Sequence, residues 1–295
     1  MNVPHPIAAE VLIHAHVPKC GGSTLNLILR NNFGRRFRAI YGLPGTKFDC
    51  DEVRKLINNA PSISCFASHA FSLDLPFGSA ARGCRAIALV RDPVRRFVSH
   101  YFYHRHHTRL VKQARQLRLE DYISYALRDG NQPTYIDGQT LFLSGSADAQ
   151  GVGRIERLLK EEKLFLFPLE HFDKACVLLE KISPVWLRDC SYIRVRVSRK
   201  DQVVTARAIE SIRPFVQLDY QLWRIAEQRL DDLLMQHFDS MSAVEEHVRG
   251  FRRRCVRAVP RLMFGRGMHF LRRIVAKCSS FEPNERPLSH AQSAP

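Results

Sequence analysis

VLIHAHVPKCGGSTL, residues 11–25, is the stretch that decides the fold of this chain. Its first seven residues are mostly apolar and are bounded by Pro18, which is typical of a buried β-strand. Beyond the glycine pair, leucine and isoleucine recur at helical spacing until Gly34, a helix-stop signal. A strand that runs through a glycine-containing loop into a helix is a building unit of α/β folds.

The same alternation of strand and helix continues along the chain. We predict strands at 62–69, 84–93 and 163–167, and an edge strand or an extended loop at 191–198. Helices are predicted at 49–61, 94–107, after 167, near 201–213 and at 215–236. This order predicts a P-loop-like, three-layer αβα domain with a central parallel sheet, followed by a basic helical C-terminal extension.

Three polar segments lie at the carboxyl ends of predicted strands. They are PKCGGST at 18–24, SHAF at 68–71 and RDP at 91–93. Ligands of parallel α/β folds bind at the carboxyl ends of the strands, so we expect these three segments to form one site.

The loop at 18–24 carries groups that bind anions. Gly21 and Gly22 permit close backbone approach, and the following helix N-terminus adds partial positive charge. Ser23 and Thr24 supply hydroxyl donors, and Lys19 supplies a full positive charge. The nucleotide-binding pattern GxxxxGK[ST] is absent, and no aspartate is obviously placed as a Mg²⁺ partner. The loop therefore suits an anion that is handled without a metal, and the alternative is a plain glycine turn.

A second anion-binding segment begins at the end of the strand at 84–93. Arg91 offers a bidentate fork to a phosphate, and Ser99 adds a hydroxyl eight residues later, about two helical turns along. Asp92 and Pro93 are typical of a helix start. The alternative is that the arginines here are solvated surface charges.

Together the two segments resemble a known pair of motifs. HVPKCGGSTL (16–25) is similar to the 5′-phosphosulfate loop of sulfotransferases that use 3′-phosphoadenosine 5′-phosphosulfate (PAPS), and RDPVRRFVSHYFY (91–103) is similar to the 3′-phosphate motif of their carbohydrate branch. DGQTLFLSG (137–145), LFLFPLEHFDKACVLLEK (164–181) and LDYQLWRIA (218–226) resemble later segments of this branch, in the same order. The branch is that of the heparan sulfate 2-O and 6-O enzymes, family 2, and the resemblance implies a bacterial-type soluble member.

The resemblance implies a site and a reaction. Its cofactor-binding residues are expected to be Lys19, Cys20, Gly21, Gly22, Ser23, Thr24, Arg91 and Ser99. His69, in a comparable sequence context, is the expected general base, and Lys19 is expected to neutralise the leaving group. His69 has an alternative interpretation as a core or capping histidine. The implied reaction is metal-independent, in-line transfer of a sulfuryl group from PAPS to an acceptor hydroxyl.

The expected acceptor is a carbohydrate, either a glycan, a glycolipid or a polysaccharide. Loops at 35–48 and 103–118 are expected to contact it. Cys20 stands where the family usually has threonine, and Leu141 stands at a position that is often arginine. These departures concern acceptor contacts more than cofactor binding.

Five further histidines lie near these motifs. His14 and His16 alternate with Ala15 on one strand face, and we expect His16 to orient the loop or the cofactor. His104, His106 and His107 have no acid or cysteine at ligand spacing, so we interpret them as a solvated or acceptor-facing surface instead of a metal site.

The overall composition indicates what kind of protein this chain is. The 295 residues are 45% hydrophobic, which is ordinary for a globular chain, and the net charge of +16 favours anionic partners. The eight cysteines form no CxxC pair, and we expect reduced thiols in a cytoplasmic protein. No signal peptide or membrane span is predicted.

The domain boundaries are expected near a change of composition. We assign 1–247 to the sulfotransferase domain, 248–278 to a basic amphipathic extension and 279–295 to a disordered tail. The extension is either a peripheral membrane contact or a merely solvated basic helix.

Two other functions compete with the sulfotransferase hypothesis. A P-loop-like kinase or nucleotide-binding enzyme would need Mg²⁺ and ATP, and a basic nucleic-acid-binding protein would bind in a salt-dependent way. The missing GK[ST] pattern argues against the first function. No helix-turn-helix, RRM or zinc-finger signature supports the second, so we expect no nucleic-acid partner.

Overall fold

The computed structural model describes residues 11–40, 47–73, 83–107, 111–195 and 203–279, with side chains as far as Met263. At its centre lies a five-stranded parallel sheet in the order β2-β3-β1-β4-β5. The strands are β1 (Val11–Ala15), β2 (Phe37–Ile40), β3 (Cys65–Ser68), β4 (Cys84–Val90) and β5 (Leu164–Pro168).

The central strand is apolar along its whole length because both of its faces are covered. All five residues of β1 are buried, including His14, so the strand does not alternate in polarity as a half-exposed strand does. β1 pairs with β3 through Leu12 and Cys65, and with β4 through Val11 and Cys84. The register brings the ends of β3, β1 and β4 together at one edge of the sheet.

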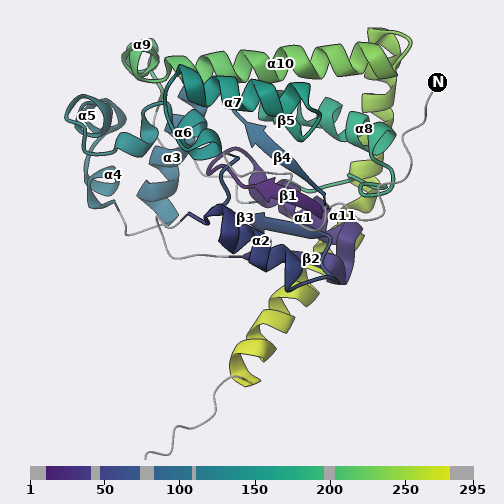
Figure 1. Cartoon of the computed structure of the whole chain (residues 1–295). Helices are drawn as coiled ribbons and strands as arrows, with labels where there is room; N and C mark the ends of the chain where they lie inside the picture. The colour runs from purple at the N-terminus through teal and green to yellow at the C-terminus, as the bar shows by residue number, and fades with distance from the viewer. Residues whose placement is uncertain (1–10, 41–46, 74–82, 108–110, 196–202, 280–295) are drawn as a thin grey trace, which may run out of the picture.

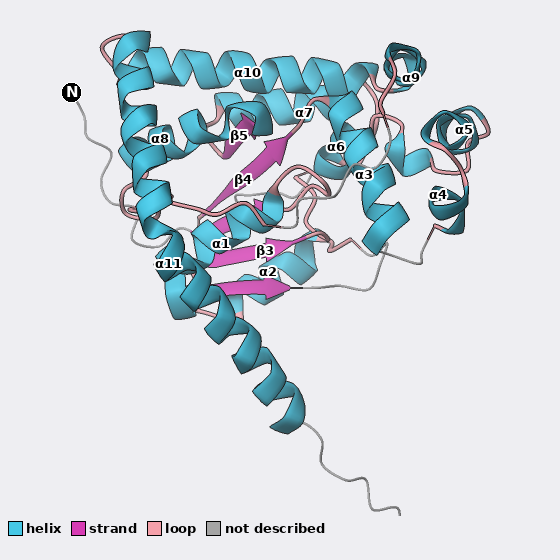
Figure 2. Cartoon of the chain, turned by 180° about the vertical axis from the view of Figure 1, so that it is seen from behind, coloured by secondary structure: helices cyan, strands magenta, loops and turns pink. Residues whose placement is uncertain are grey.

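Helices cover both faces of the sheet and make three layers, as expected from the sequence. They are α1 (Gly22–Phe33) and α8 (Phe172–Ile182) on one face, and α2 (Cys50–Asn58) and α7 (Ala149–Lys160) on the other (Figures 1 and 2). The steps from β1 to β2 and from β4 to β5 run in opposite directions along the sheet. Right-handed crossovers therefore place α1 and α7 on opposite faces.

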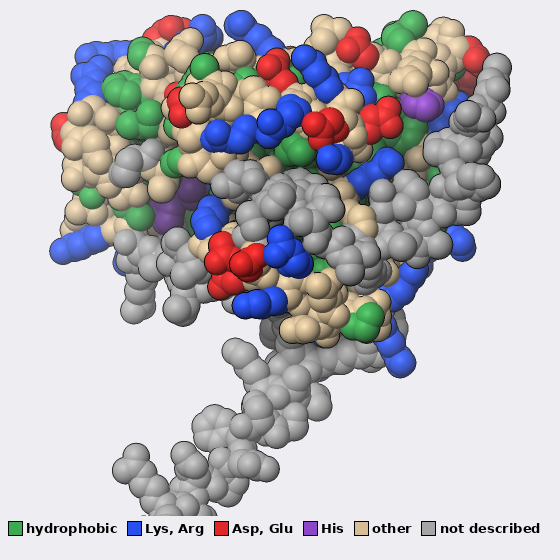
Figure 3. All heavy atoms as spheres, viewed as in Figure 1, with side chains coloured by type: hydrophobic (Ala, Val, Ile, Leu, Met, Phe, Trp, Pro, Cys, Tyr) green, Lys and Arg blue, Asp and Glu red, His purple; other side chains and the backbone are tan. Residues whose placement is uncertain are grey.

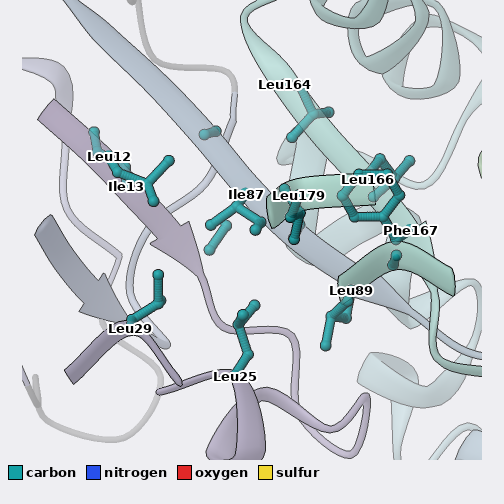
Figure 4. Packing of buried hydrophobic residues seen from close by; sticks show 14 of the residues in the cluster. Leu12, Ile13, Leu25, Leu29, Ile87, Leu89, Leu164, Leu166, Phe167 and Leu179 are labelled. Atoms are coloured by element: carbon teal, nitrogen blue, oxygen red, sulfur yellow. The ribbon is translucent and has the colours of Figure 1, made fainter. Parts of the chain in front are cut away.

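The main core fills the space between the sheet and these helices. Its members include Leu12 and Ile13 of β1, Leu25 and Leu29 of α1, and Ile87, Leu89, Leu166, Phe167 and Leu179 (Figure 4). Caps fix where the flanking helices begin, because Asp49 and Glu52 form a reciprocal capping box on α2 and Asp148 caps α7.

A second layer of helices lies beyond the carboxyl ends of the strands, on the side to which the arrowheads in Figure 2 point. It has its own core, which includes Phe97, Tyr101, Tyr122, Tyr135 and Ile212. Its helices are α3 (Pro93–His107), α4 (Lys112–Gln116), α5 (Leu119–Ile123), α6 (Gly138–Ser144) and α9 (Ala206–Ile212). The layer formed by α3, α4, α5, α6 and α9 lies above the sheet edge where the three polar segments emerge.

Shorter helical turns of the whole chain lie at 34–36, 124–128, 133–135, 169–171 and 213–215.

The last two helices are long. α10 (Gln217–His237) packs on β5, and α11 (Met241–Ser279) packs first on α8 and then projects from the body (Figures 1 and 2). The boundary expected after residue 247 falls inside α11. Val248 and Phe251 are each 1% exposed and belong to the main core, so the first part of the basic segment is built into the domain. Among the described residues, no helix is long and apolar enough to cross a membrane.

Some expectations differ from the structure. The segment 35–48 was expected as a loop but contains β2, an edge strand whose residues are half-buried or exposed. Residues 191–195 form a loop, which was one of the two alternatives given for 191–198, and 196–198 lie outside the described residues. The helices α4, α5, α6 and α7 were not predicted individually. Nearly all of the predicted disordered tail also lies outside the described residues.

The place of α11 in the core gives a stability prediction. We expect Phe251→Ala to lower the free energy of unfolding by about 3–5 kcal/mol, because it removes a buried aromatic ring. Val256→Ala on the same helix is the control, because Val256 is 71% exposed and should change this free energy by less than about 0.5 kcal/mol. Urea unfolding followed by circular dichroism measures both, and equal effects would contradict the assignment of α11 to the domain.

Candidate active site

The three polar segments meet at one edge of the sheet. The loop at 18–24 follows β1, His69 follows β3, and Arg91 follows β4, and these three strands are neighbours. The connection from β1 leads to one side of the sheet and the connection from β4 leads to the other. The crevice between β1 and β4 is thus a topological switch point, where parallel α/β proteins bind ligands.

Two backbone features give the loop after β1 its shape. Lys19 and Gly21 both adopt the left-handed conformation, with φ of 67° and 80°. A lysine in this conformation is strained, and such strain persists only where the surrounding structure holds it. Gly22 is required for a different reason. A Cβ atom there would lie 2.0 Å from the ring of His16, so the loop passes directly against that histidine.

The helix that follows the loop begins without a side-chain cap. Gly21 occupies the N-cap position, no side chain caps α1, and the first turn holds no acidic residue. The first N–H groups of a helix need partners, and the helix dipole makes that end favourable for an anion. Ser23 lies half-buried in this first turn, where its hydroxyl adds a further donor.

Two of the residues predicted to bind the donor in this loop also contact other parts of the protein. The Cys20 thiol is fully buried and donates to Gln139 Oε1 at 3.1 Å, and its backbone N–H donates to the Val17 carbonyl at 3.4 Å. Burial raises the pKa of this thiol to about 12, so it is neutral. The Thr24 hydroxyl oxygen accepts from the backbone N–H of Val195 at 3.4 Å. Cys20 therefore fixes the loop from inside.

Gln139 joins the two anion segments and was missed as a site residue in the sequence. Its Oε1 accepts from the backbone N–H of Arg91 at 2.8 Å, and its Nε2 donates to the Arg91 carbonyl at 2.9 Å. Together with the bond from Cys20, these contacts make one fully buried amide the bridge between the loop after β1 and the turn after β4. Its place in the QT segment, which resembles a family motif, was the available signal.

Asp219 and Glu170 hold this bridge in place. Asp219 is 1% exposed and accepts from the backbone N–H groups of Gln139 and Thr140 at 3.0 and 2.8 Å. Burial raises the pKa of Asp219, and the positive charge of Arg96 opposes that rise. Glu170 accepts from the Asp92 N–H at 3.3 Å and from the Trp223 indole at 3.1 Å. Residues of the three later motifs (137–145, 164–181 and 218–226) thus hold the two anion-binding segments in place.

Arg91 lies where the resemblance expects an anion-binding arginine. Its Nη1 donates to the Lys19 carbonyl at 3.2 Å, which ties it to the loop after β1. Its Nε is buried and has no hydrogen-bond partner among the described residues. Ser99 is half-buried on α3, two turns further on. An unpartnered buried guanidinium nitrogen beside a donor-rich loop is favourable for an anion.

The Lys19 side chain reaches the helix α3. Its Nζ lies 4.1 Å from the centre of the Tyr103 ring, a cation–π distance. His104, the next residue on α3, is buried at 9% exposure, so it is not the solvated histidine expected from the sequence. Burial and the charge of Lys19 lower the pKa of His104 and favour its neutral form. His106 and His107 are exposed as expected, and the described residues contain no cluster that could hold a metal.

A row of three histidines crosses the ends of β1 and β3. The rings of His14 and His16 stack with centroids 5.0 Å apart, and the ring of His69 lies 3.9 Å from that of His16. His14 is fully buried and His69 is exposed, so the row leads from the core to the surface. Asn26 on α1 contacts two of them, through His14 Nδ1 at 2.7 Å and His16 Nδ1 at 3.3 Å.

These contacts determine where the ring protons lie. The His69 Nδ1 atom is 2.7 Å from the His16 carbonyl oxygen. A carbonyl only accepts, so His69 Nδ1 carries a proton, and in the neutral ring Nε2 carries the lone pair. His14 Nδ1 donates to Asn26 Oδ1 in the same way, which leaves its buried Nε2 without a partner among the described residues. Burial lowers the pKa of His14 to about 4.

The low pKa of His14 predicts a pH-dependent stability. The folded state binds the proton more weakly than the unfolded chain, so stability is full above about pH 6.5 and falls as the pH drops toward 4. We expect the wild-type protein to lose roughly 3 kcal/mol through this group by about pH 4, and His14→Gln to lack this loss. Urea unfolding of both proteins across this range is the measurement, and parallel pH profiles would contradict a buried neutral His14.

Two comparisons with known proteins return a match and one returns none. Residues 8–139, which include the loop after β1, His69, Arg91 and Gln139, match the sequence profile of the sulfotransferase family. A search of curated proteins finds no match to the chain. A solved structure of a sulfotransferase from Alicyclobacillus acidocaldarius is similar, at 15% sequence identity and a TM-score of 0.41, over 74% of this chain and 95% of that one.

Proposed function

Because residues 8–139 match the sequence profile of the sulfotransferase family, we propose that the chain transfers a sulfuryl group from PAPS to a carbohydrate hydroxyl without a metal ion. The observation that carries the proposal is the bridge at Gln139. It brings an uncapped helix N-terminus, Lys19 and the unpartnered Nε of Arg91 to one crevice.

The residues at the crevice fit a donor with phosphate groups at both ends. Backbone N–H groups of α1, the Ser23 hydroxyl and the Lys19 ammonium would hold the 5′-phosphosulfate, and Arg91 with Ser99 would hold the 3′-phosphate. No acidic residue lies in the first turn of α1. PAPS, when bound, supplies a sulfuryl group already activated for transfer.

His69 is the proposed general base. Because its Nδ1 donates to the His16 carbonyl, Nε2 is the basic atom of the neutral ring, and it would accept the proton of the acceptor hydroxyl as the new S–O bond forms. The ring is exposed at the sheet edge beside the loop, so an acceptor can reach it. His16 supports the base by stacking beneath it at 3.9 Å, which is a positioning role.

Lys19 is the proposed stabiliser of the leaving group. Negative charge grows on the bridging oxygen as the S–O bond to the donor breaks, and a preorganised cation there lowers the barrier. The strained backbone of Lys19 and the contact of its ammonium group with Tyr103 place this charge before any ligand arrives.

The proposed acceptor is a carbohydrate, on the strength of the motif resemblance. His106 and His107 at the end of α3 are exposed on the same helix as Tyr103, which contacts Lys19. A kinase that uses ATP and Mg²⁺ is the competing function, and no contact among the described residues at the crevice favours it.

The experiment measures binding and transfer separately. Calorimetry with adenosine 3′,5′-bisphosphate, the expected product, should show metal-independent binding that weakens about ten- to a hundredfold in Lys19→Ala and Arg91→Ala, since each loses a charged donor. Transfer from labelled PAPS to a glycan panel should fall about a hundredfold or more in His69→Ala, with product binding unchanged.

A matched control and clear contrary outcomes accompany these assays. Arg157→Ala removes one exposed charge from α7, away from the crevice, and should change neither binding nor transfer. Absence of binding to the bisphosphate, or ATP binding that requires Mg²⁺, would overturn the sulfotransferase proposal. Full transfer activity in His69→Ala would show that His69 is not the base, and it would not contradict the proposed donor site.

A further inference from the structure

The sequence of α11 has an unusual charge pattern. From His247 to Ser279 the helix contains no aspartate or glutamate. Its basic residues are Arg249, Arg252, Arg253, Arg254, Arg257, Arg261, Arg266, Arg272, Arg273 and Lys277. On the face of the body shown in Figure 3, in contrast, basic side chains are interspersed with acidic ones. A helix segment whose charges are all positive attracts anionic partners, because its own side chains do not neutralise one another.

One face of α11 is used by the domain itself. Val244, Val248, Phe251, Ala258 and Leu262 are buried, and they recur at the three- and four-residue spacing of one helix face. This row docks the helix and leaves the opposite face outward.

Three arginines beside the buried row pair with the body. Arg252 Nε lies 2.6 Å from Asp173, Arg261 Nη2 lies 2.6 Å from Asp189, and Arg254 pairs with Glu180. These pairs fix how the helix is rotated about its own axis, so the identity of the outward residues is also fixed.

The outward face combines exposed apolar and unpaired basic side chains. Val256 is 71% exposed and Met263 is 55% exposed. Arg253 and Arg257 lie to one side of Val256 round the helix and are exposed, and neither has an ion-pair partner among the described residues. A helix with apolar side chains beside a row of positive charges is typical of segments that lie in the membrane interface.

We propose that this face of α11 binds the surface of an anionic lipid bilayer. The arginines would contact lipid phosphates, and Val256 and Met263 would enter the boundary between headgroups and acyl chains. A nucleic acid offers the phosphates but no apolar layer for those two side chains. A second copy of this chain offers the apolar face but brings the same positive charges, which repel.

The position of the helix is compatible with an accessible crevice. Figure 2 shows the first half of α11 at the side where the strands begin, whereas the loop at 18–24 and Arg91 lie where the strands end. Lipid contact through α11 therefore leaves the crevice open to its substrates, and the proposal does not depend on the proposed function.

Vesicle co-sedimentation of the full chain tests the proposal. We expect binding to mixed phosphatidylcholine–phosphatidylglycerol vesicles and none to phosphatidylcholine alone. Arg253→Gln with Arg257→Gln should weaken binding roughly thirtyfold, since each basic residue near the surface strengthens binding about fivefold. Val256→Ser with Met263→Ser should weaken binding roughly tenfold, although this pair leaves the charge unchanged.

Matched variants elsewhere on the protein distinguish binding through this face of α11 from a general attraction of the positively charged chain to anionic vesicles. Arg157→Gln with Lys160→Gln removes the same charge from α7, and Val185→Ser with Val203→Ser removes equally exposed apolar side chains elsewhere. Both pairs should bind like the wild type. Equal weakening by both charge pairs would overturn the proposal, as would unaffected binding by Val256→Ser with Met263→Ser. Binding to RNA but not to vesicles, or dimerisation lost in these same variants without vesicle binding, would also overturn it.

Discussion

The side-chain amide of Gln139 is the interaction on which the candidate site depends. It pairs with both backbone groups of Arg91, 48 positions away in the sequence, and accepts from the thiol of Cys20, 119 positions away. A buried amide with unmade hydrogen bonds costs about 1–3 kcal/mol for each lost partner, so this bridge holds the loop after β1 and the turn after β4 at one spacing. Asp219, on α10, holds Gln139 itself in place, because its carboxylate accepts from the backbone N–H of Gln139.

The same loop also constrains the histidine row. Gly22 passes against the ring of His16, and His16 in turn stacks beneath His69. A larger residue at Gly22 would displace His16 and with it the proposed base, so donor loop and base share one wall of the crevice. Contact with His16 therefore explains why position 22 is a glycine, which anion binding alone does not explain. The first glycine serves the left-handed turn with φ of 80°.

The features that the sequence predicts are those set by local pattern, and the features it misses depend on distant contacts. The strand at 11–15, the glycine loop and the helix at 22–33 follow from spacing within about twenty residues, and they are confirmed. The edge strand at 37–40 is missed because its few residues owe their conformation to pairing with β3. Cys20 is a departure from the family pattern in the sequence. Its hydrogen bond to Gln139 explains why a thiol fits there, but no local pattern contains that bond. His104 is buried because Tyr135 and the layer of helices cover it, which polarity along α3 does not reveal.

The most direct test of this account is the affinity of Gln139→Ala for adenosine 3′,5′-bisphosphate, measured by calorimetry beside its free energy of unfolding. Gln150→Ala, an exposed glutamine on α7, is the matched control. The account predicts that Gln139→Ala still unfolds cooperatively and binds the bisphosphate at least about tenfold more weakly, since Arg91 and the loop after β1 lose their common partner. Wild-type affinity in a folded Gln139→Ala protein would contradict the claim that this amide sets the spacing of the two anion-binding segments.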